Sequence, residues 1–206
     1  MKTKVLFFLM LLFFPFLIQE AKSQCLPDCF NDAWGNTEYY NIQNDCGIFG
    51  VEYSTRFACG MYFDVEIRKI FVDYIKPECK DMDKKEFINM ITLEMLMQNP
   101  MEFPPDSNKP GCQENWRVMT GGCWVQAFLC GVGNIKETKL LSDKDPIEKG
   151  GKFISCSNDG ICCLEFFKVC YDEKTKVREI TNTGYQPSPE KCENPYCFPT
   201  CGTIYR

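Results

Sequence analysis

The fold of this chain is decided by residues 47–74, which read GIFGVEYSTRFACGMYFDVEIRKIFVDY. Apolar side chains recur there at nearly every second position, which is the period of a β-strand with one buried face. The Cys59-Gly60 dipeptide interrupts the pattern, as expected where a chain reverses. We therefore predict two strands around this break, although residues 67–71 also fit a short helical pattern.

Residues 83–98 are the best helix candidate. Asp83, with Glu86 three residues later, makes a capping pattern, and Asn99-Pro100 provides a stop. The apolar residues of this segment cover most of the helix circumference, which is typical of a buried helix. Because several of them are Met, a Met-rich side that contacts a partner chain is the alternative.

The remaining segments complete a mainly β architecture. We predict irregular, disulfide-linked segments at both ends of the mature chain, at 24–45 and from about residue 186. Between them we predict a proline-rich loop at 99–111, a strand pair or one strand with a glycine bulge at 115–126, and a surface segment at 131–151. A hairpin formed by 152–157 and 161–171 and a further strand at 177–183 follow. The predicted fold class is α+β, mainly β, with antiparallel strands, one main helix at about 83–98 and many disulfide bonds.

Residues 1–23 have the pattern of a secretory signal peptide. Two Lys residues precede the apolar run 5–18, and small residues stand at the −3 and −1 positions of a cleavage site before Gln24. This run is shorter than the roughly 20 apolar residues that a membrane-spanning helix needs. We expect 24–206 to form a single disulfide-rich globular domain with no transmembrane segment.

Cysteine is frequent, and its number is odd. The 15 cysteines are Cys25, Cys29, Cys46, Cys59, Cys79, Cys112, Cys123, Cys130, Cys156, Cys162, Cys163, Cys170, Cys192, Cys197 and Cys201. Because an exported chain meets an oxidising compartment, we expect about seven disulfide bonds and one Cys left over. That Cys is a buried free thiol, a link to a second copy or a surface partner, or a reactive catalytic thiol, although the chain has no His to activate one.

The composition excludes several classes of function. With no His in the chain, Ser-His-Asp and Cys-His catalysis and His-ligated haem or zinc are excluded. The net charge of −5 argues against nucleic-acid binding. The Cys and Asp spacings match neither a zinc nor a calcium motif, so we expect no metal and no cofactor.

Carboxylates are the only plentiful acid–base groups that remain. A hydrolase of the glycosidase type needs two of them in one cleft. Asp64 and Glu66 alternate along a predicted strand, so they share one face, and Glu165 stands between apolar neighbours. A secreted carboxylate-dependent hydrolase is therefore the alternative function, whereas a solvated strand face explains the same residues without catalysis.

Aromatic residues near the start of the mature chain are the candidate ligand-binding residues. Trp34 lies in a stretch rich in Asn and Gly, and Tyr39 and Tyr40 follow it closely. Exposed aromatic rings of this kind bind glycans or peptides, because they offer a large rigid surface.

Several segments together resemble one group of proteins. They are Cys25 to Cys29 with Trp34, Asn99 to Pro105, Asn115 to Trp124, and Cys162-Cys163 ahead of Val169-Cys170, all after a signal sequence that ends before Gln24. This chain resembles uncharacterised cysteine-rich exported proteins of Bacteroidota-type bacteria. The resemblance implies a Gram-negative envelope, hence a periplasmic, outer-surface or released protein, and it implies no activity.

The sequence thus favours a secreted or cell-surface protein that binds or assembles over an enzyme. Its expected partners are a second copy or a surface protein through the odd Cys, and a glycan or peptide ligand. The periplasm is the other location that these features permit.

Overall fold

A computed structural model describes residue 29, residues 31–132, 135–156 and 162–186, residue 192 and residues 194–200. For residues 129–132, 135–137 and 162 it describes the backbone alone. The predicted signal peptide at 1–23 lies outside the described residues.

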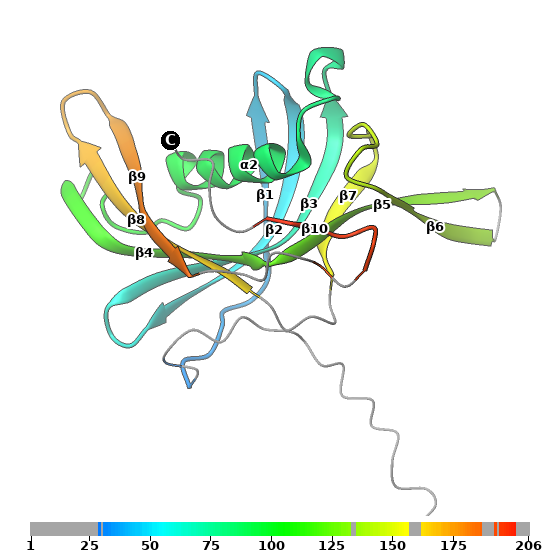
Figure 1. Cartoon of the computed structure of the whole chain (residues 1–206). Helices are drawn as coiled ribbons and strands as arrows, with labels where there is room; N and C mark the ends of the chain where they lie inside the picture. The colour runs from blue at the N-terminus through cyan, green and yellow to red at the C-terminus, as the bar shows by residue number, and fades with distance from the viewer. Residues whose placement is uncertain are drawn as a thin grey trace, which may run out of the picture.

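The described chain is mainly β, with one α-helix that crosses the concave side of a curled sheet (Figure 1). Its elements are β1 (Glu38–Asn44), β2 (Gly47–Ala58), β3 (Tyr62–Ile75), the 3-10 turn η1 (Pro77–Cys79), α2 (Lys84–Gln98), β4 (Gly111–Gly121), β5 (Cys123–Val132), β6 (Ile135–Leu141), β7 (Gly151–Ser155), β8 (Cys162–Asp172), β9 (Val177–Gln186) and β10 (Phe198–Pro199). All ten of these strands belong to one sheet.

The predicted strands in 47–74 are confirmed as the β2–β3 hairpin. Cys59 and Gly60 have φ angles of 54° and 66°. Two successive positive φ angles are typical of the tight turns that match the twist of a hairpin. The prediction for 24–45 is wrong in its second half, because residues 38–44 form β1, which pairs with β2 as an antiparallel edge strand.

The prediction of an antiparallel sheet is only partly right, because the sheet is mixed. β3 pairs in parallel with β4, from Phe63 opposite Trp116 to Glu66 opposite Met119. A short turn can only join antiparallel neighbours, whereas a parallel pair needs a long crossover. The segment between β3 and β4 supplies it, since it contains η1, α2 and the loop that precedes Gly111.

The sheet forks where β4 ends and β5 begins. These strands are almost continuous, with Gly122 between them, yet they do not pair with each other. β7 lies in the fork, antiparallel to both β3 and β5. The predicted hairpin of 152–157 with 161–171 is therefore wrong: β7 and β8 are both strands, but β8 pairs with β4 and β9.

Two further segments differ from the sequence prediction. Residues 135–141, predicted to be part of a surface excursion, form β6 and pair with β5 in a hairpin that projects from the body of the sheet (Figure 1). In the tail, Phe198 and Pro199 pair with Trp124 and Cys123 as the short strand β10. The strand predicted at 177–183 is confirmed as part of β9.

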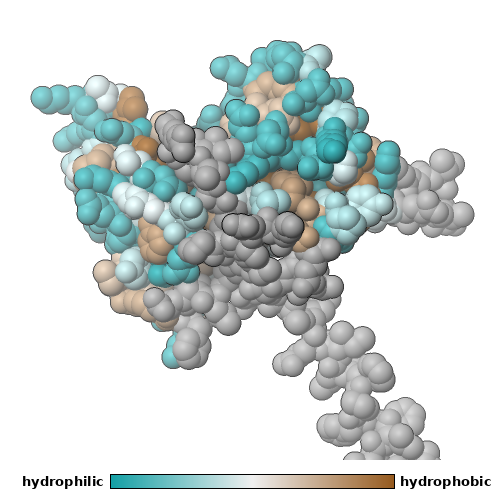
Figure 2. Space-filling model, viewed as in Figure 1, coloured by the Kyte–Doolittle hydropathy of each residue, from teal (hydrophilic) through white to brown (hydrophobic). Residues whose placement is uncertain are grey.

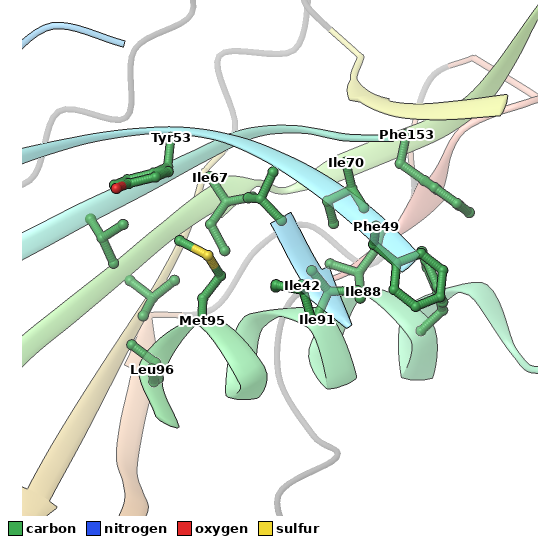
Figure 3. Packing of buried hydrophobic residues seen from close by; sticks show 14 of the residues in the cluster. Ile42, Phe49, Tyr53, Ile67, Ile70, Ile88, Ile91, Met95, Leu96 and Phe153 are labelled. Carbon is green, nitrogen blue, oxygen red and sulfur yellow. The ribbon is translucent and has the colours of Figure 1, made fainter. Parts of the chain in front are cut away.

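The predicted helix is confirmed almost to the residue. The Asp83 carboxylate accepts hydrogen bonds from the backbone N–H groups of Lys85 and Glu86, and the helix ends at Asn99, which has a left-handed conformation. Figure 3 shows Ile88, Ile91 and Met95 pointing toward the sheet. Burial of the helix, rather than exposure of a Met-rich side, explains most of its apolar residues.

The hydrophobic core lies between α2 and the concave face of the sheet. Phe87 on the helix contacts both Phe49 and Phe153, with ring centroids 5.1 and 5.0 Å apart. On the described surface seen in Figure 2, hydrophilic residues prevail and hydrophobic residues form smaller patches between them. The concave face of the sheet is thus the apolar one, and we call it the helix face and the opposite side the outer face.

Candidate functional site

The three candidate ligand-binding aromatics do not form one surface. Tyr40 points to the helix face, where its hydroxyl donates a hydrogen bond to Gln98 Oε1 at 3.0 Å. Tyr39, its neighbour in β1, points to the outer face and is 52% exposed. Trp34 also lies on the outer face, where it packs against Met119 and Leu164.

Trp34 covers a group of buried charges. The guanidinium carbon of Arg56 lies 4.5 Å from the centroid of the Trp34 ring. Arg56 Nη1 donates to the backbone carbonyl of Asp32 at 3.0 Å, which ties the segment around Trp34 to β2. The Trp34 ring is therefore occupied by contacts within the chain, which leaves it less available to a ligand than the sequence suggests.

Asp64 is the centre of this charged group, which we call the Arg–Asp–Arg cluster: Arg56, Asp64 and Arg117. Asp64 Oδ2 accepts hydrogen bonds from Arg56 Nε at 2.9 Å and from Arg117 Nη2 at 2.8 Å, and Oδ1 accepts one from Arg117 Nε at 2.6 Å. The three residues lie side by side on β2, β3 and β4. The Tyr62 ring covers Arg117 at 3.9 Å, as Trp34 covers Arg56.

The structure does not bring the predicted catalytic carboxylates together. Asp64 and Glu66 share the outer face, as predicted, but Asp64 is held by two arginines and Glu66 accepts a hydrogen bond from Arg68 Nε at 2.9 Å. Glu165 is opposite Val118, a core residue, and so lies on the helix face. The sheet therefore separates Glu165 from the other two, and arginines hold both Asp64 and Glu66 in ion pairs.

Glu165 is the most perturbed acid among the described residues. Its side chain is 5% exposed, and this burial raises its pKa from 4.5 to about 7, with the charge of Lys85 acting in the opposite direction. A carboxyl group with such a pKa is half protonated near neutral pH. Among the three candidate carboxylates Glu165 is alone on the helix face, and its raised pKa follows from its burial in the core.

Five disulfide bonds are defined. They join Cys29 to Cys59, Cys46 to Cys79, Cys112 to Cys170, Cys123 to Cys192, and Cys156 to Cys197. Cys163 is disulfide-bonded as well. Cys25 and Cys201 lie outside the described residues, as do the side chains of Cys130 and Cys162. The disulfide-rich character is thereby confirmed, and the existence of one odd Cys stays a prediction.

Two findings bear on metals and membranes. The residues with described placement contain no group of three or more His, Cys, Asp or Glu side chains that could hold a metal ion. Within the same residues, no helix has the length and apolarity that crossing a bilayer requires.

Tyr39, an open aromatic ring on the outer face, is supported by residues that sequence reasoning missed. Gly50 lies beneath the Tyr39 ring, since a Cβ added to Gly50 would overlap the phenol group. Phe71 stands beside it, with ring centroids 5.9 Å apart and planes inclined by 53°. The available signal was Gly50 itself, because a lone Gly inside a strand pattern indicates a close approach of another group.

Sequence reasoning also missed Arg56 and Arg117. Both are long charged side chains in β-strands, and each is more than nine-tenths buried. A long charged side chain is rarely buried unless it is paired, and Asp64 is the partner of both arginines.

Comparisons of the chain with family models, with curated proteins and with solved structures give no significant match in any of the three.

Proposed function

We propose that this chain is an extracellular or cell-surface module that binds or assembles with other molecules and catalyses no reaction. Its disulfide bonds fit an oxidising, non-cytoplasmic compartment. The separation of Glu165 from Asp64 and Glu66 removes the main support for the hydrolase alternative. The resemblance to exported Bacteroidota-type proteins is compatible with this role and adds no activity to it.

The observation that carries the assembly half of the proposal is the backbone position of Cys130. Cys130 is opposite Glu137 in the β5–β6 hairpin, and the last pair between β5 and β7 is Phe128 with Gly151. The backbone of Cys130 thus lies in the projecting part of the hairpin, away from the body of the sheet.

Three of the other cysteines outside the five defined bonds are tied to the opposite end of β5. Cys162 and Cys163 are opposite Gly121 and Thr120 in the β4–β8 pair, and Cys201 follows Thr200, whose N–H donates to the Gly122 carbonyl. Eight residues of strand separate Gly122 from Cys130, on the order of 25 Å. A disulfide bond needs Cα atoms within about 7 Å, so none of the three fits as a partner of Cys130.

Cys25 is excluded as a partner by the same kind of reasoning. It stands four residues from Cys29, a reach of at most about 14 Å, and Cys29 is bonded to Cys59 at the turn before β3. Phe71 on β3 and Ala127 on β5 are both paired with Lys152 on β7, so they lie at the same level of the sheet. Cys59 is twelve residues before Phe71, on the order of 40 Å of strand, which is beyond the reach of Cys25.

We therefore infer that Cys130 is the odd cysteine and links this chain to a second copy or to a surface partner. Cys25, Cys162, Cys163 and Cys201 would then complete two further bonds, for a total of seven. A closed dimer is the simplest assembly that one such thiol produces, because a single symmetric bond uses both copies of Cys130.

The test is intact mass spectrometry of the secreted protein after thiol alkylation, without and with reductant. We expect a disulfide-linked dimer or mixed disulfide that disappears on reduction, and a mature chain that begins at Gln24. In the Cys130→Ser variant we expect a monomer with no alkylated thiol. The control is Cys112→Ser, which breaks the bond to Cys170 and should add one reactive thiol without abolishing the linkage.

Other outcomes contradict specific parts of the proposal. A wild-type monomer alkylated at Cys130 would leave the assignment of seven internal bonds intact and would exclude assembly through this residue. Alkylation at any other Cys would contradict the assignment of the odd cysteine.

A further inference from the structure

The outer face carries an exposed aromatic surface that is separate from the Arg–Asp–Arg cluster. We call it the Tyr39 platform: Tyr39, Gly50, Phe71, Ile48 and Tyr74. Tyr39 is 52%, Tyr74 44% and Ile48 39% exposed. Ile48 and Tyr74 are directly opposite each other in the β2–β3 pair, and Gly50 is opposite Phe71. The five residues therefore lie together on β1, β2 and β3.

Gly50 gives the Tyr39 ring a fixed orientation. Tyr39 is opposite Glu52, so Gly50 is its diagonal neighbour, within reach of an aromatic side chain. The ring occupies the space that a Cβ of Gly50 would fill. It therefore lies against the backbone of β2 and beside Phe71, while half of its surface stays open to solvent. A ring held in this way loses little conformational entropy when a ligand stacks on it.

The charges around the platform balance. Glu52 and Asp73 are the acidic neighbours, and both act on the Tyr39 hydroxyl. Lys69 Nζ lies 2.5 Å from Glu52 Oε2, and Lys152, on β7, is opposite Phe71. Burial, followed by the charges of Asp73 and Glu52, raises the pKa of Tyr39, so that its hydroxyl remains a hydrogen-bond donor. Such a rim offers many donors and acceptors and no net charge, which suits a neutral polar ligand.

We propose that the Tyr39 platform binds a sugar unit of a neutral glycan. A pyranose ring has one face of C–H groups, which stacks on an aromatic ring, and a rim of hydroxyl groups, which hydrogen-bond to charged and amide side chains. The platform presents both kinds of partner on one face of the sheet, with Asn41 opposite Gly50 as an exposed amide at the rim. The inference deepens the binding half of the proposed function and does not depend on assembly through Cys130.

The test begins with an array of neutral and acidic glycans probed with the purified mature protein. The best neutral oligosaccharide is then titrated by calorimetry against the wild type and variants. We expect Tyr39→Ala to weaken binding at least tenfold, which is about 1.4 kcal/mol. Tyr185→Ala is the matched control, because Tyr185 is equally exposed, at 50%, but lies on β9.

Gly50→Ala provides a second variant that removes no side chain. The new methyl group forces the Tyr39 ring off the strand, so we expect a similar loss of binding. In the double variant with Tyr39→Ala, the Gly50 substitution should have no further effect, because the ring that it displaces is absent. The Cys130→Ser protein should bind as the wild type does, which separates this proposal from the assembly proposal.

Several outcomes would overturn the inference. They are the absence of any glycan signal that depends on Tyr39, binding to acidic glycans alone, and binding to peptides instead of glycans. Concentration-dependent dimerisation that Tyr39→Ala abolishes would assign the platform to contact between copies and would also overturn it.

Discussion

The two faces of one sheet bury their side chains in opposite ways. On the helix face, Phe49, Ile70 and Val72 are excluded from water by apolar contacts that need no particular direction. On the outer face, Arg56, Asp64 and Arg117 are buried almost as completely, but by charge pairing, hydrogen bonds and two covering rings. The comparison teaches that alternation along a strand decides which side chains share a face and leaves open how that face is stabilised.

The largest effect is expected from Asp64→Asn, which breaks the outer face alone. An amide in place of the carboxylate leaves two buried guanidinium groups without a counter-charge, and its NH₂ group opposes their donors. Loss of one partner from a buried ion pair costs about 3–5 kcal/mol. The free energy of unfolding, measured by urea titration of the oxidised protein, should fall by that amount.

Two further variants make this prediction more specific. Asp73→Asn, an exposed carboxylate on the same strand, should leave the unfolding free energy nearly unchanged. The triple variant with Arg56→Met, Asp64→Leu and Arg117→Met should recover most of the loss, since apolar residues often replace a buried ion cluster without cost. A loss below about 1 kcal/mol for Asp64→Asn would mean that water reaches the cluster.

The sequence predicted the helix face better than the outer face. The period-two pattern of 47–74 and the cap at Asp83 depend on neighbouring residues, and the structure confirms both. The parallel β3–β4 pair and the insertion of β7 between β3 and β5 depend on contacts between distant segments, which no local pattern reports. The partners of Asp64 were missed for the same reason, because Arg117 is 53 residues away.

The next largest effect is expected on the helix face, from Ile91→Ala. Ile91 is fully buried between α2 and the sheet, and truncation to Ala removes apolar area and leaves a cavity. Comparable substitutions cost about 2–5 kcal/mol, so we expect about 3 kcal/mol by urea titration. Met97→Ala, on the exposed side of the same helix, is the control and should cost less than about 1 kcal/mol. Equal losses for the two variants would contradict the assignment of the helix face.

Glu165→Gln tests a buried carboxyl group on the helix face. The folded-state pKa of about 7 lies above the ordinary 4.5, so the folded state binds more protons and wild-type stability falls as the pH rises from 4.5 to 7. A shift of that size corresponds to about 3 kcal/mol. We expect the stability of Glu165→Gln relative to wild type to increase by that amount between pH 4 and pH 8, as measured by urea titrations at several pH values. A difference that does not vary with pH would contradict the burial of this carboxyl.

The smallest effect is expected from Asp83→Ala, at the end of the helix that covers the core. The substitution removes the acceptor for the N–H groups of Lys85 and Glu86, and such a loss costs about 1 kcal/mol. Thermal unfolding should show a small decrease in melting temperature, whereas Asp81→Ala, which caps nothing among the described residues, should show none. A loss as large as that of Ile91→Ala would mean that Asp83 has a further role.

Of the candidate site, Tyr39 could be named from the sequence and its surroundings could not. The side on which a strand residue points follows from alternation, which separates Tyr39 from Tyr40 once β1 is known. Residues 24–45 lack a clear pattern, however, so β1 was not expected, and the Tyr39 platform depends on it. The contact of Tyr39 with Gly50 and Phe71 joins three strands, and it becomes visible only when their registers are known.

The disulfide bond between Cys156 and Cys197 has a mechanical consequence. A pulling force applied to the chain beyond Thr200 meets the hydrogen bonds of β10 and then, at Cys197, passes through a covalent bond to Cys156 at the end of β7. The load therefore bypasses the β8–β9 hairpin, which lies inside the covalent loop, and acts on a strand held on both sides by β3 and β5. On a surface exposed to shear, this hairpin would keep its shape until the bond itself was reduced.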